Sequence, residues 1–363
     1  MSVHASYHWD EETVKSGIGG SETYIFEVSK RLSLAGYDVT LYADPEFDHD
    51  PYENFHLVSY KRYYYDVLHR EYDYFIFFRE VSVNTVLPYL KCHNVFAILS
   101  DTQILAPLSK LYQIGLGRIK KYCYLSEYHK MNLLDIYEHI GLTEDLLYKI
   151  SNGYSTEFYE NVDLHSKTNS MIWSSSLCRG FYEFYNYVFV KVREKIPDFI
   201  LYVCTEATNS EVNDQLNEIS KHDGVVVLNR LSKEELANYQ KQSKIWVYPG
   251  TFPETFCITA SENVNAGNVV ICPLSYGLYT TLENVNYLKE WDLNILTEDN
   301  AYTYIEKIVE ILNNDDLRIK LASENLNSCD FSWDKSTKEI IDLFENDKMT
   351  ERQLNQYVNK VSY

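Results

Sequence analysis

Short apolar runs alternate with stretches of helical spacing along most of the chain. Apolar side chains recur on one helical face between residues 21 and 35, which predicts a helix over Ser21–Ala35. Around this helix and after it, we expect strands at Val3–Tyr7, Asp38–Tyr42, Tyr74–Phe78, Val95–Leu99 and Lys121–Leu125. Such alternation is typical of repeated βα units around a mainly parallel sheet.

A second alternating series follows a polar segment, residues 151–169, which lacks periodicity and contains the turn signal Asn152-Gly153. Here we expect strands at Ser170–Ser174, Phe199–Cys204, Val225–Leu228, Ile245–Tyr248 and Val269–Cys272. Ser232 and Glu235 have the spacing of a capping box, which predicts a helix start, and from Tyr302 onward the pattern is helical only. Two doubly wound α/β domains are expected to face each other across a cleft, with a ligand at the carboxyl ends of their strands.

Composition limits the function classes. The chain has 363 residues, 45% of them hydrophobic, which allows two domains or three. Its net charge is −20, the wrong sign for a surface that neutralises phosphates, so nucleic acid is not expected as a partner. Lys120 and Lys121, beside two tyrosines, could contact a lipid headgroup, but a solvated edge is the favoured interpretation.

The spacing of the cysteines and the length of the apolar runs indicate the cellular compartment of the protein. Seven cysteines are scattered without a Cys-x-x-Cys pair, which argues against a disulfide framework or a zinc site and for a reducing environment. The first residues lack a basic region followed by an apolar one, and no run of 18 apolar residues occurs, so neither a signal peptide nor a transmembrane segment is expected. A cytoplasmic protein is therefore predicted.

A glycine-rich loop, Ser16–Glu22, precedes the first predicted helix. Gly19 and Gly20 would let the backbone approach a bound group, and the helix start favours an anion. The dinucleotide fingerprint would need glycine at position 22, where the chain has Glu22, and no Lys-Ser/Thr pair makes a P-loop. A glycine-rich turn without a ligand remains an equal alternative.

A second loop, Pro249–Glu262, follows the fourth strand of the second half. Glu254 would lie in the turn before a helix and Glu262 two turns inside it, so an extended ligand could contact both carboxylates. The backbone N–H groups between them would face a phosphate; they belong to Thr255, Phe256 and Cys257. The alternative is that Glu254 only complements the helix dipole and Glu262 is solvated, although the apolar neighbours of Glu262 indicate a buried helix.

Five motifs occur in a fixed order: Gly19-Gly20-Ser21-Glu22, Ser151-Asn152-Gly153, Ser174-Ser175-Ser176 followed by Arg179-Gly180, the pair Glu254 and Glu262 followed by Asn263-Val264-Asn265-Ala266-Gly267, and Phe331-Ser332-Trp333. Together they resemble retaining glycosyltransferases of the GT-B fold, and in particular the large family-4 class (glycosyl transferases group 1). The resemblance covers the whole chain. It implies two Rossmann-like domains, residues 1–152 and 153–339, with the C-terminal helices, about 340–363, crossing back so that Tyr357 and Val358 pack on the first domain.

The resemblance also implies roles for single residues. Glu262 matches the glutamate that binds the donor ribose, Glu254 the one near the transferred sugar, and Arg179 the cation that neutralises the leaving diphosphate. Gly19 and Gly20 match the loop near the diphosphate and sugar. The other expected donor-binding positions are Arg230, Thr255, Phe256 and Cys257, and Asp101 is a further catalytic candidate.

Three positions depart from the family pattern. Ser174 stands where a second basic residue is common, Ser100 precedes Asp101 where a histidine is common, and Asn263 replaces an alanine. These changes bear on catalytic efficiency more than on fold.

The implied reaction moves a hexosyl group from a nucleotide-sugar to a hydroxyl of a glycan or other acceptor, with retention and without a metal or other cofactor. A UDP-sugar is favoured over a GDP-sugar. Two alternatives are a non-catalytic protein that binds nucleotide-sugar or glycan, and a sugar-nucleotide epimerase.

A cluster of tyrosines in the first domain could stack on acceptor sugars, but tyrosine rings that cover the sheet are the favoured interpretation. The cluster consists of Tyr60, Tyr63, Tyr64 and Tyr65, beside Lys61 and Arg62. Nothing in the pattern predicts an oligomeric state.

Overall fold

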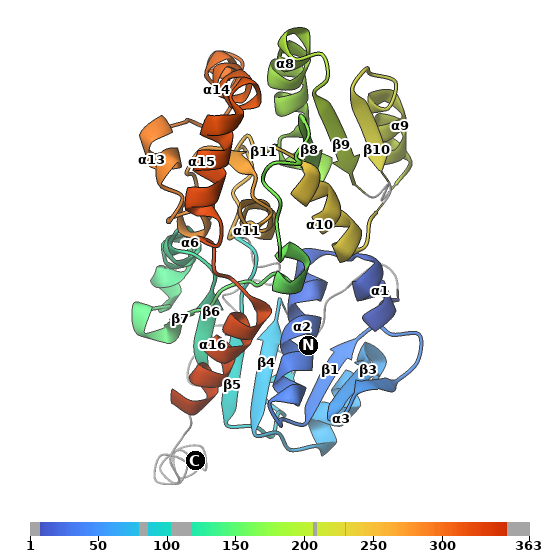
Figure 1. Cartoon of the computed structure of the whole chain (residues 1–363). Helices are drawn as coiled ribbons and strands as arrows, with labels where there is room; N and C mark the ends of the chain where they lie inside the picture. Colours follow the sequence, from blue (N-terminus) through green and yellow to red (C-terminus); the bar gives the residue numbers. More distant parts are fainter. Residues whose placement is uncertain (1–7, 80–85, 103–117, 206–208, 229, 347–363) are drawn as a thin grey trace. The chain divides into compact units, whose positions relative to one another are not determined.

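The computed structural model describes residues 8–79, 86–102, 118–205, 209–228 and 230–346 (Figure 1). These residues form two compact units. One combines the chain up to Gly153 with the segment from Trp333, and the other spans Tyr154–Ser332 together with Lys15–Gly17. The predicted strand Val3–Tyr7 and the tail residues Tyr357 and Val358 lie outside the described residues.

The first unit contains two sheets. Four parallel strands lie in the order β4 (Tyr74–Phe78), β5 (Asn94–Ile98), β6 (Ile119–Tyr124) and β7 (Leu147–Lys149). In the other sheet the central strand is β3 (Phe55–Ser59), parallel to β1 (Val39–Ala43) and antiparallel to β2 (His49–Tyr52). The predicted strands in the described part of this unit are present within two residues, whereas β2, β3 and β7 were not expected.

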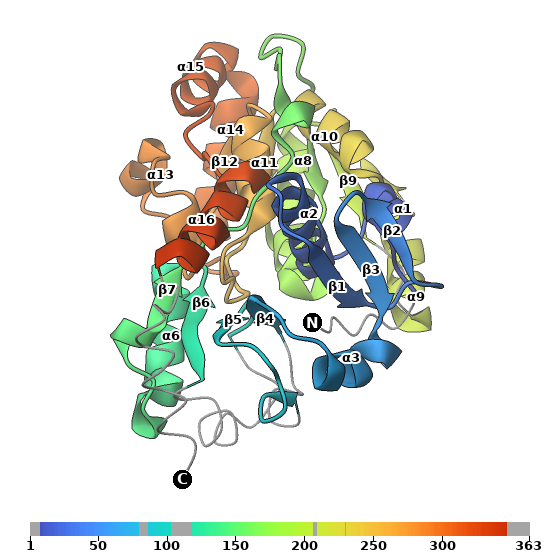
Figure 2. The same cartoon turned by 90° about the horizontal axis from the view of Figure 1, so that it is seen from below.

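Both faces of the four-stranded sheet are buried, as parallel sheets require (Figure 2). Alternate residues of β4 point to opposite faces, so Phe75 and Phe77 enter one core. On the other face Phe78 stacks on Tyr24, with ring centroids 5.5 Å apart. The covering helices of this unit are α2 (Gly20–Leu34), α3 (Tyr63–His69), α6 (Glu127–Tyr137) and α16 (Trp333–Asn346).

Helix α16 returns to the first unit, as the fold prediction requires. Phe344 stacks on Tyr74 with ring centroids 4.2 Å apart. In the middle of the helix, Glu339 Oε2 accepts from Ser151 N at 2.6 Å and from Ser151 Oγ at 2.9 Å. A side chain at Gly153 would place its Cβ 2.4 Å from the Trp333 ring, so only glycine fits there. The C-terminal helix is thus bound to this unit by both stacking and charge-assisted hydrogen bonds.

All five strands predicted for the second half are present, each within one residue of its predicted bounds. Three are parallel in the order β10 (Val225–Leu228), β9 (Ile200–Cys204) and β8 (Ser170–Trp173), and two form a parallel pair, β11 (Ile245–Val247) and β12 (Val269–Ile271). The N–H of Lys244 donates to the carbonyl of Ser170 at 3.2 Å, which joins the start of β11 to the start of β8.

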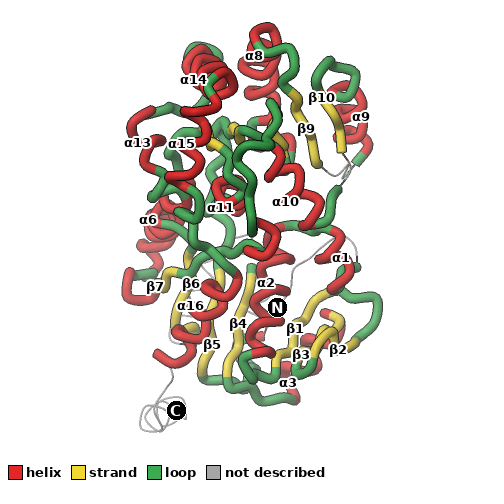
Figure 3. Tube along the Cα trace, viewed as in Figure 1, coloured by secondary structure: helices red, strands yellow, loops and turns green. Residues whose placement is uncertain are grey.

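Helices cover the strands of the second unit (Figure 3). A helical stretch after β8 contains α7 (Phe181–Glu183), a π-helix (Phe184–Phe189) and α8 (Val190–Lys195). The capping box predicted at Ser232 and Glu235 is present and opens α10. The remaining α-helices are α1 (Glu11–Ser16), α9 (Ser210–Ile219), α10 (Lys233–Gln242), α11 (Ile258–Asn265), α12 (Leu278–Thr281), α13 (Asn286–Trp291), α14 (Ala301–Asn313) and α15 (Asp315–Asn325).

A buried lysine ties three segments of the second unit together. Lys167 Nζ lies within hydrogen-bonding distance of four oxygens, the carbonyls of Lys241 (2.7 Å), Ser243 (3.0 Å) and Ala266 (2.7 Å) and Asn268 Oδ1 (2.9 Å), which share its three N–H groups. The Lys167 residue is only 6% exposed. One ammonium therefore satisfies carbonyls at the C-terminal ends of both α10 and α11, where a cation also complements the helix dipoles.

Lys167→Met should destabilise the second unit, because it fills the same space and leaves these buried oxygens without a donor. We expect a loss of about 1–3 kcal/mol or more, the cost of burying unsatisfied polar groups. Urea unfolding monitored by circular dichroism measures it, with Lys221→Met, at an exposed position, as the control. Equal stability of the two variants would contradict the role of Lys167.

Candidate functional site

Arg179 and Glu254 form an ion pair at the carboxyl ends of the second unit's strands. Arg179 lies in the loop after β8 and Glu254 in the loop after β11. Arg179 Nη1 donates to Glu254 Oε1 at 2.7 Å and to Oε2 at 2.9 Å, and the guanidinium lies over the Phe252 ring at 4.4 Å. The structure thus brings together two of the predicted catalytic residues, which lie 75 positions apart in sequence.

Glycines allow close contacts in these two loops: Gly180 lets the loop after β8 approach the loop after β11, and Gly250 lets the loop after β11 approach Pro273. Gly180 has φ +95°, and an added Cβ would lie 2.4 Å from Thr251 Oγ1. Gly250 has φ +74°, and its Cβ would lie 2.3 Å from Pro273. Left-handed backbone and close contacts both exclude larger residues here, so the glycine after Arg179 positions the arginine beside Glu254.

The carboxylate of Glu254 accepts a second strong hydrogen bond. Tyr248 Oη donates to Glu254 Oε1 at 2.6 Å, and Glu254 is only 5% exposed. Burial and the nearby charge of Glu254 hold the pKa of Tyr248 far above its usual range, so the phenol stays protonated. Burial alone would lower the pKa of Arg179, but the Glu254 carboxylate outweighs it and raises that pKa. A permanently charged arginine therefore faces a buried anion.

Part of the guanidinium remains available to a ligand. Within the described residues only Nη1 of Arg179 donates to protein, and the side chain is 38% exposed. Nε and Nη2 can therefore donate to oxygens of a bound anion, and the planar fork suits phosphate.

The backbone turns sharply between Glu254 and α11. Cys257 has φ +75°, and the carbonyls of Thr255 and Glu254 lie 2.5 and 2.6 Å from where a Cβ on Gly277 would be. The side chains of Phe256 and Cys257 are buried. A ligand at the start of α11 could thus contact these two residues only through their backbone N–H groups.

Glu262 lies on α11 and is 5% exposed, so the solvated alternative is wrong. Its Oε2 accepts from Gln240 Nε2 at 3.3 Å, and its Oε1 lies 4.0 Å from Lys233 Nζ. Gln240 in turn accepts from Tyr159 Oη at 2.6 Å. Neither contact of Glu262 is short, so the carboxylate retains acceptor capacity for hydroxyl groups.

Two of the departures from the family pattern have structural correlates. Asn263 is fully buried: its Nδ2 donates to Thr259 O at 2.8 Å and its Oδ1 accepts from Asn268 Nδ2 at 2.7 Å. Asn268 Oδ1 also accepts from Lys167, so the contact between Asn263 and Asn268 connects α11 to the buried ammonium. Ser174 Oγ is buried and has no hydrogen-bond partner among the described residues.

The other expected donor positions are less informative. Arg230 is exposed and lies between β10 and α10. In the first unit Gly19 precedes α2, and Glu22 folds back so that its Oε2 would lie 2.4 Å from a Cβ on Gly19. The roles of Arg230, Gly19 and Gly20 in donor binding stay predictions.

Sequence reasoning missed a residue that contacts Asp101. Arg79, directly after β4, donates from Nε to Asp101 Oδ2 at 2.6 Å and from Nη1 to Ser21 Oγ at 2.9 Å. Its φ of +49° is unusual for a residue other than glycine, and such strain often accompanies functional sites. The sequence signal that could have identified Arg79 is a basic residue directly after a strongly apolar strand. In the first unit, Arg79 links the start of α2 to Asp101.

His129 is buried on α6 next to Asp101. Its Nδ1 accepts from Leu125 N at 3.2 Å, and its Nε2 lies 3.2 Å from the carbonyl of Asp101. This arrangement fits a neutral imidazole with the proton on Nε2. Burial lowers the pKa of His129 to about 4, which keeps it neutral at physiological pH. No group of three or more His, Cys, Asp or Glu side chains that could hold a metal ion occurs among the described residues.

Comparison with known proteins finds a family match within the second unit. Residues 187–328 match the family model described as glycosyl transferases group 1. The match contains Glu254 and Glu262, and no curated protein matches the chain.

Solved glycosyltransferases show the same fold. The catalytic domain of starch synthase IV from Arabidopsis thaliana, bound to ADP and acarbose, aligns with TM-score 0.64 and 10% identity over 91% of this chain and 96% of that one. WaaG, a glycosyltransferase involved in lipopolysaccharide biosynthesis, aligns with TM-score 0.61 and 12% identity over 90% and 96%. TarM from S. aureus, in complex with UDP among other ligands, aligns with TM-score 0.53 and 14% identity over 70% of this chain, which spans 51% of TarM. The glycosyltransferase fold of this chain is GT-B, as predicted.

Acidification should unfold the first unit partly through His129. An unfolded histidine has a pKa near 6.5, so between about pH 6.5 and pH 4 only the unfolded chain takes up this proton. The free energy of unfolding therefore decreases as the pH is lowered through this range. His129→Asn, whose amide oxygen can replace Nδ1 as an acceptor, should remove on the order of 3 kcal/mol of this pH dependence. Urea unfolding of both proteins at pH 7 and pH 4 measures it; parallel pH profiles would show that His129 is not the titrating group.

Proposed function

We propose that this chain is a retaining glycosyltransferase that moves a hexosyl group from a nucleotide-sugar to a hydroxyl of a glycan or other acceptor. The observation that carries the proposal is the ion pair of Arg179 and Glu254, which the buried Glu262 follows on α11. The ion pair lies in loops at the carboxyl ends of parallel strands, in the unit that contains the family match. An open α/β sheet binds its ligands at that edge.

In the proposed complex the second unit holds the donor. Glu262 accepts hydrogen bonds from the two ribose hydroxyls, since its carboxylate retains acceptor capacity. The diphosphate lies at the start of α11, where backbone N–H groups and the free Nε and Nη2 of Arg179 donate to it. Because the charge on the diphosphate grows as the glycosidic bond breaks, these donors stabilise the transition state more than the ground state.

Glu254 contacts the transferred sugar in this proposal, and its geometry fits a positioning task. Arg179 and Tyr248 fix its carboxylate at 2.6–2.9 Å, so the remaining lone pairs have a defined direction. No protein nucleophile is needed, because the acceptor hydroxyl attacks from the face that the diphosphate leaves. In the first unit Asp101, held by Arg79, is the candidate group for the acceptor side.

We propose a UDP-sugar as the donor, with a GDP-sugar as the alternative. No metal has a role in this proposal. TarM with UDP and starch synthase IV with ADP support a nucleoside diphosphate as the ligand class. The seven free cysteines are consistent with the proposed cytoplasmic location. In the described ranges, no helix combines the length and apolar character of a membrane span.

Glu262→Ala should weaken nucleoside diphosphate binding while the fold persists. Two charge-assisted hydrogen bonds are lost, so we expect affinity to fall about tenfold to several hundredfold. Thermal shift with UDP, GDP, ADP and NAD first identifies the ligand, and calorimetry then compares Glu262→Ala with Glu290→Ala, a substitution at an exposed glutamate. Unchanged affinity in a folded Glu262→Ala protein would overturn the ribose assignment, and stabilisation by NAD alone would overturn the donor class.

Glu254→Gln should separate turnover from nucleotide binding. The amide keeps the shape but loses the charge that faces Arg179, so we expect UDP or GDP to bind within a few-fold of the parent while release of nucleotide from the sugar donor falls at least about tenfold. A nucleotide-release assay with excess EDTA measures both this loss and the proposed independence from metal. Parent-like turnover in Glu254→Gln would remove Glu254 from the mechanism, and absence of any turnover or hydrolysis by the parent would favour the non-catalytic alternative.

A further inference from the structure

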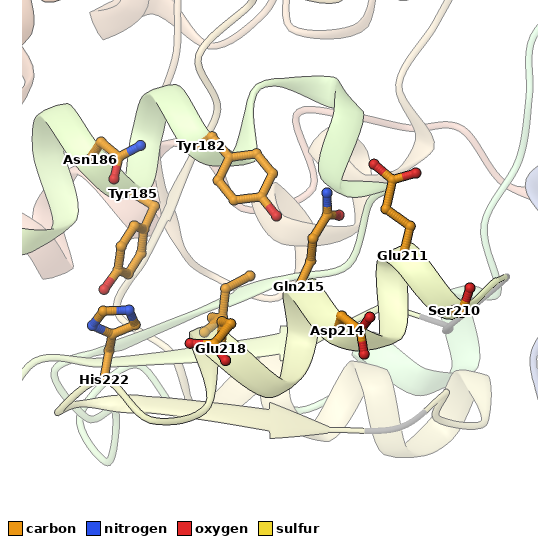
Figure 4. A pocket seen from close by; sticks show the side chains of 10 residues that line it. Tyr182, Tyr185, Asn186, Ser210, Glu211, Asp214, Gln215, Glu218 and His222 are labelled. Atoms are coloured by element: carbon orange, nitrogen blue, oxygen red, sulfur yellow. The ribbon is translucent and has the colours of Figure 1, made fainter.

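A hollow of about 600 Å³ lies on the second unit between the helical stretch after β8 and helix α9 (Figure 4). Its volume falls within the range of small-molecule sites, which is about 300–1,000 Å³. The lining residues are Tyr182, Tyr185, Asn186, Ser210, Glu211, Asp214, Gln215, Glu218, Ile219 and His222. None of them belongs to the proposed donor site, so the hollow is a separate feature.

The helix on one side of the hollow contains a π-helical segment, Phe184–Phe189. Segments with i→i+5 hydrogen bonds are rare and often occur at functional sites. Phe181, Phe184 and Tyr185 belong to the buried core, and Tyr182, Tyr185 and Asn186 line the hollow. The helix thus packs on its own sheet with one face and presents the Tyr182 ring and the Asn186 amide to α9 with the other.

Helix α9 supplies polar groups from the opposite side. Glu211, Asp214, Gln215 and Glu218 are three or four residues apart and so share one helical face. In Figure 4, Glu211 and Gln215 point toward the helix that carries Tyr182. Within the described residues Glu211 and Asp214 make no ion pair or hydrogen bond, so their carboxylates can accept from a ligand.

The mixture of groups decides which ligand class fits. Tyrosine rings offer apolar faces to the C–H face of a sugar. Carboxylates only accept hydrogen bonds, whereas the amides of Asn186 and Gln215 both donate and accept. Sugar hydroxyls also do both and can match every group, while a polyamine, which only donates, would leave the amide N–H groups without an acceptor.

We propose that this hollow is a second saccharide-binding site, which takes a neutral hexose unit of a glycan chain away from the donor site. The choice of a saccharide rests on the proposed glycosyltransferase function. A site of this kind would hold an extended acceptor or product and so favour long glycans over short ones.

Ligand-observed NMR titrations of the full chain test the proposal. The probes are the methyl α-glycosides of glucose, galactose and mannose, maltotriose, and spermidine. At least one saccharide should bind with a Kd of about 10 mM or lower. Tyr182→Ala should weaken that binding at least about fivefold, and Tyr182→Phe, which keeps the ring face, should retain it within about twofold.

Controls separate this site from the rest of the protein. Tyr279→Ala removes an exposed ring elsewhere in the same unit and should bind as the parent does. Saturating UDP should not displace the saccharide, and melting temperatures confirm that each variant is folded. Parent-like binding by Tyr182→Ala, displacement by UDP, or binding of spermidine without any saccharide would overturn the proposal.

The outcomes also distinguish this proposal from the proposed function. If saccharide binding depends on Tyr182 but no nucleotide-sugar is turned over, the glycosyltransferase proposal fails and the saccharide site stands. If turnover is normal but no saccharide binds in the hollow, only the second site is overturned.

Discussion

The buried carboxylate of Glu254 is the constraint around which the second unit's site is arranged. A carboxylate that is 5% exposed requires donors, and Arg179 and Tyr248 supply them from two other parts of the chain. Meeting that requirement fixes the loop after β8 against the loop after β11. Gly180 follows from the same constraint, because a side chain there would collide with Thr251 and Pro249 and hold the two loops apart. The ion pair therefore organises backbone as well as charge.

A second polar network holds the helix that carries Glu262. Asn263, Asn265 and Asn268 occupy the end of α11 and its exit, where asparagine would ordinarily compete with helix formation. Here their amide N–H groups find acceptors: Asn265 Nδ2 donates to Ser261 O and to Cys329 O at 2.8 and 2.9 Å, and Asn268 Nδ2 donates to Asn263 Oδ1 at 2.7 Å. Asn265 Oδ1 is buried without a hydrogen-bond partner among the described residues. Replacement of the family's small residue by Asn263 thus alters how the helix is anchored without exposing it. This explains why a polar helix segment can sit in a core.

The sequence predicted the parallel strands well because long apolar runs and helical stripes are strong local signals. It did not predict three strands: β2, whose four residues include Pro51, β7, which has only three residues, and the five-residue β3. Short edge strands depend on a neighbouring strand for their hydrogen bonds and leave little periodicity to detect. The burial of Glu254 and Glu262 could be expected from the resemblance and from apolar neighbours. The pairing of Glu254 with Arg179 and the contact of Arg79 with Asp101 could not be derived from spacing, because both join loops distant in sequence and depend on tertiary structure.

The return of α16 to the first unit also sets an order of events during synthesis. Ribosomes deliver the N-terminal part first, yet the face formed by Tyr24, Tyr74 and Phe78 receives Trp333 and Phe344 only after the entire second unit has been made. A nascent chain that ends before position 333 would expose this aromatic face to solvent and to chaperones. The second unit, whose sheet and covering helices are contiguous in sequence, can complete its core earlier. The first unit, which begins the chain, is therefore the last to complete its fold. Truncations near the C-terminal end should harm folding of the first unit more than folding of the second unit.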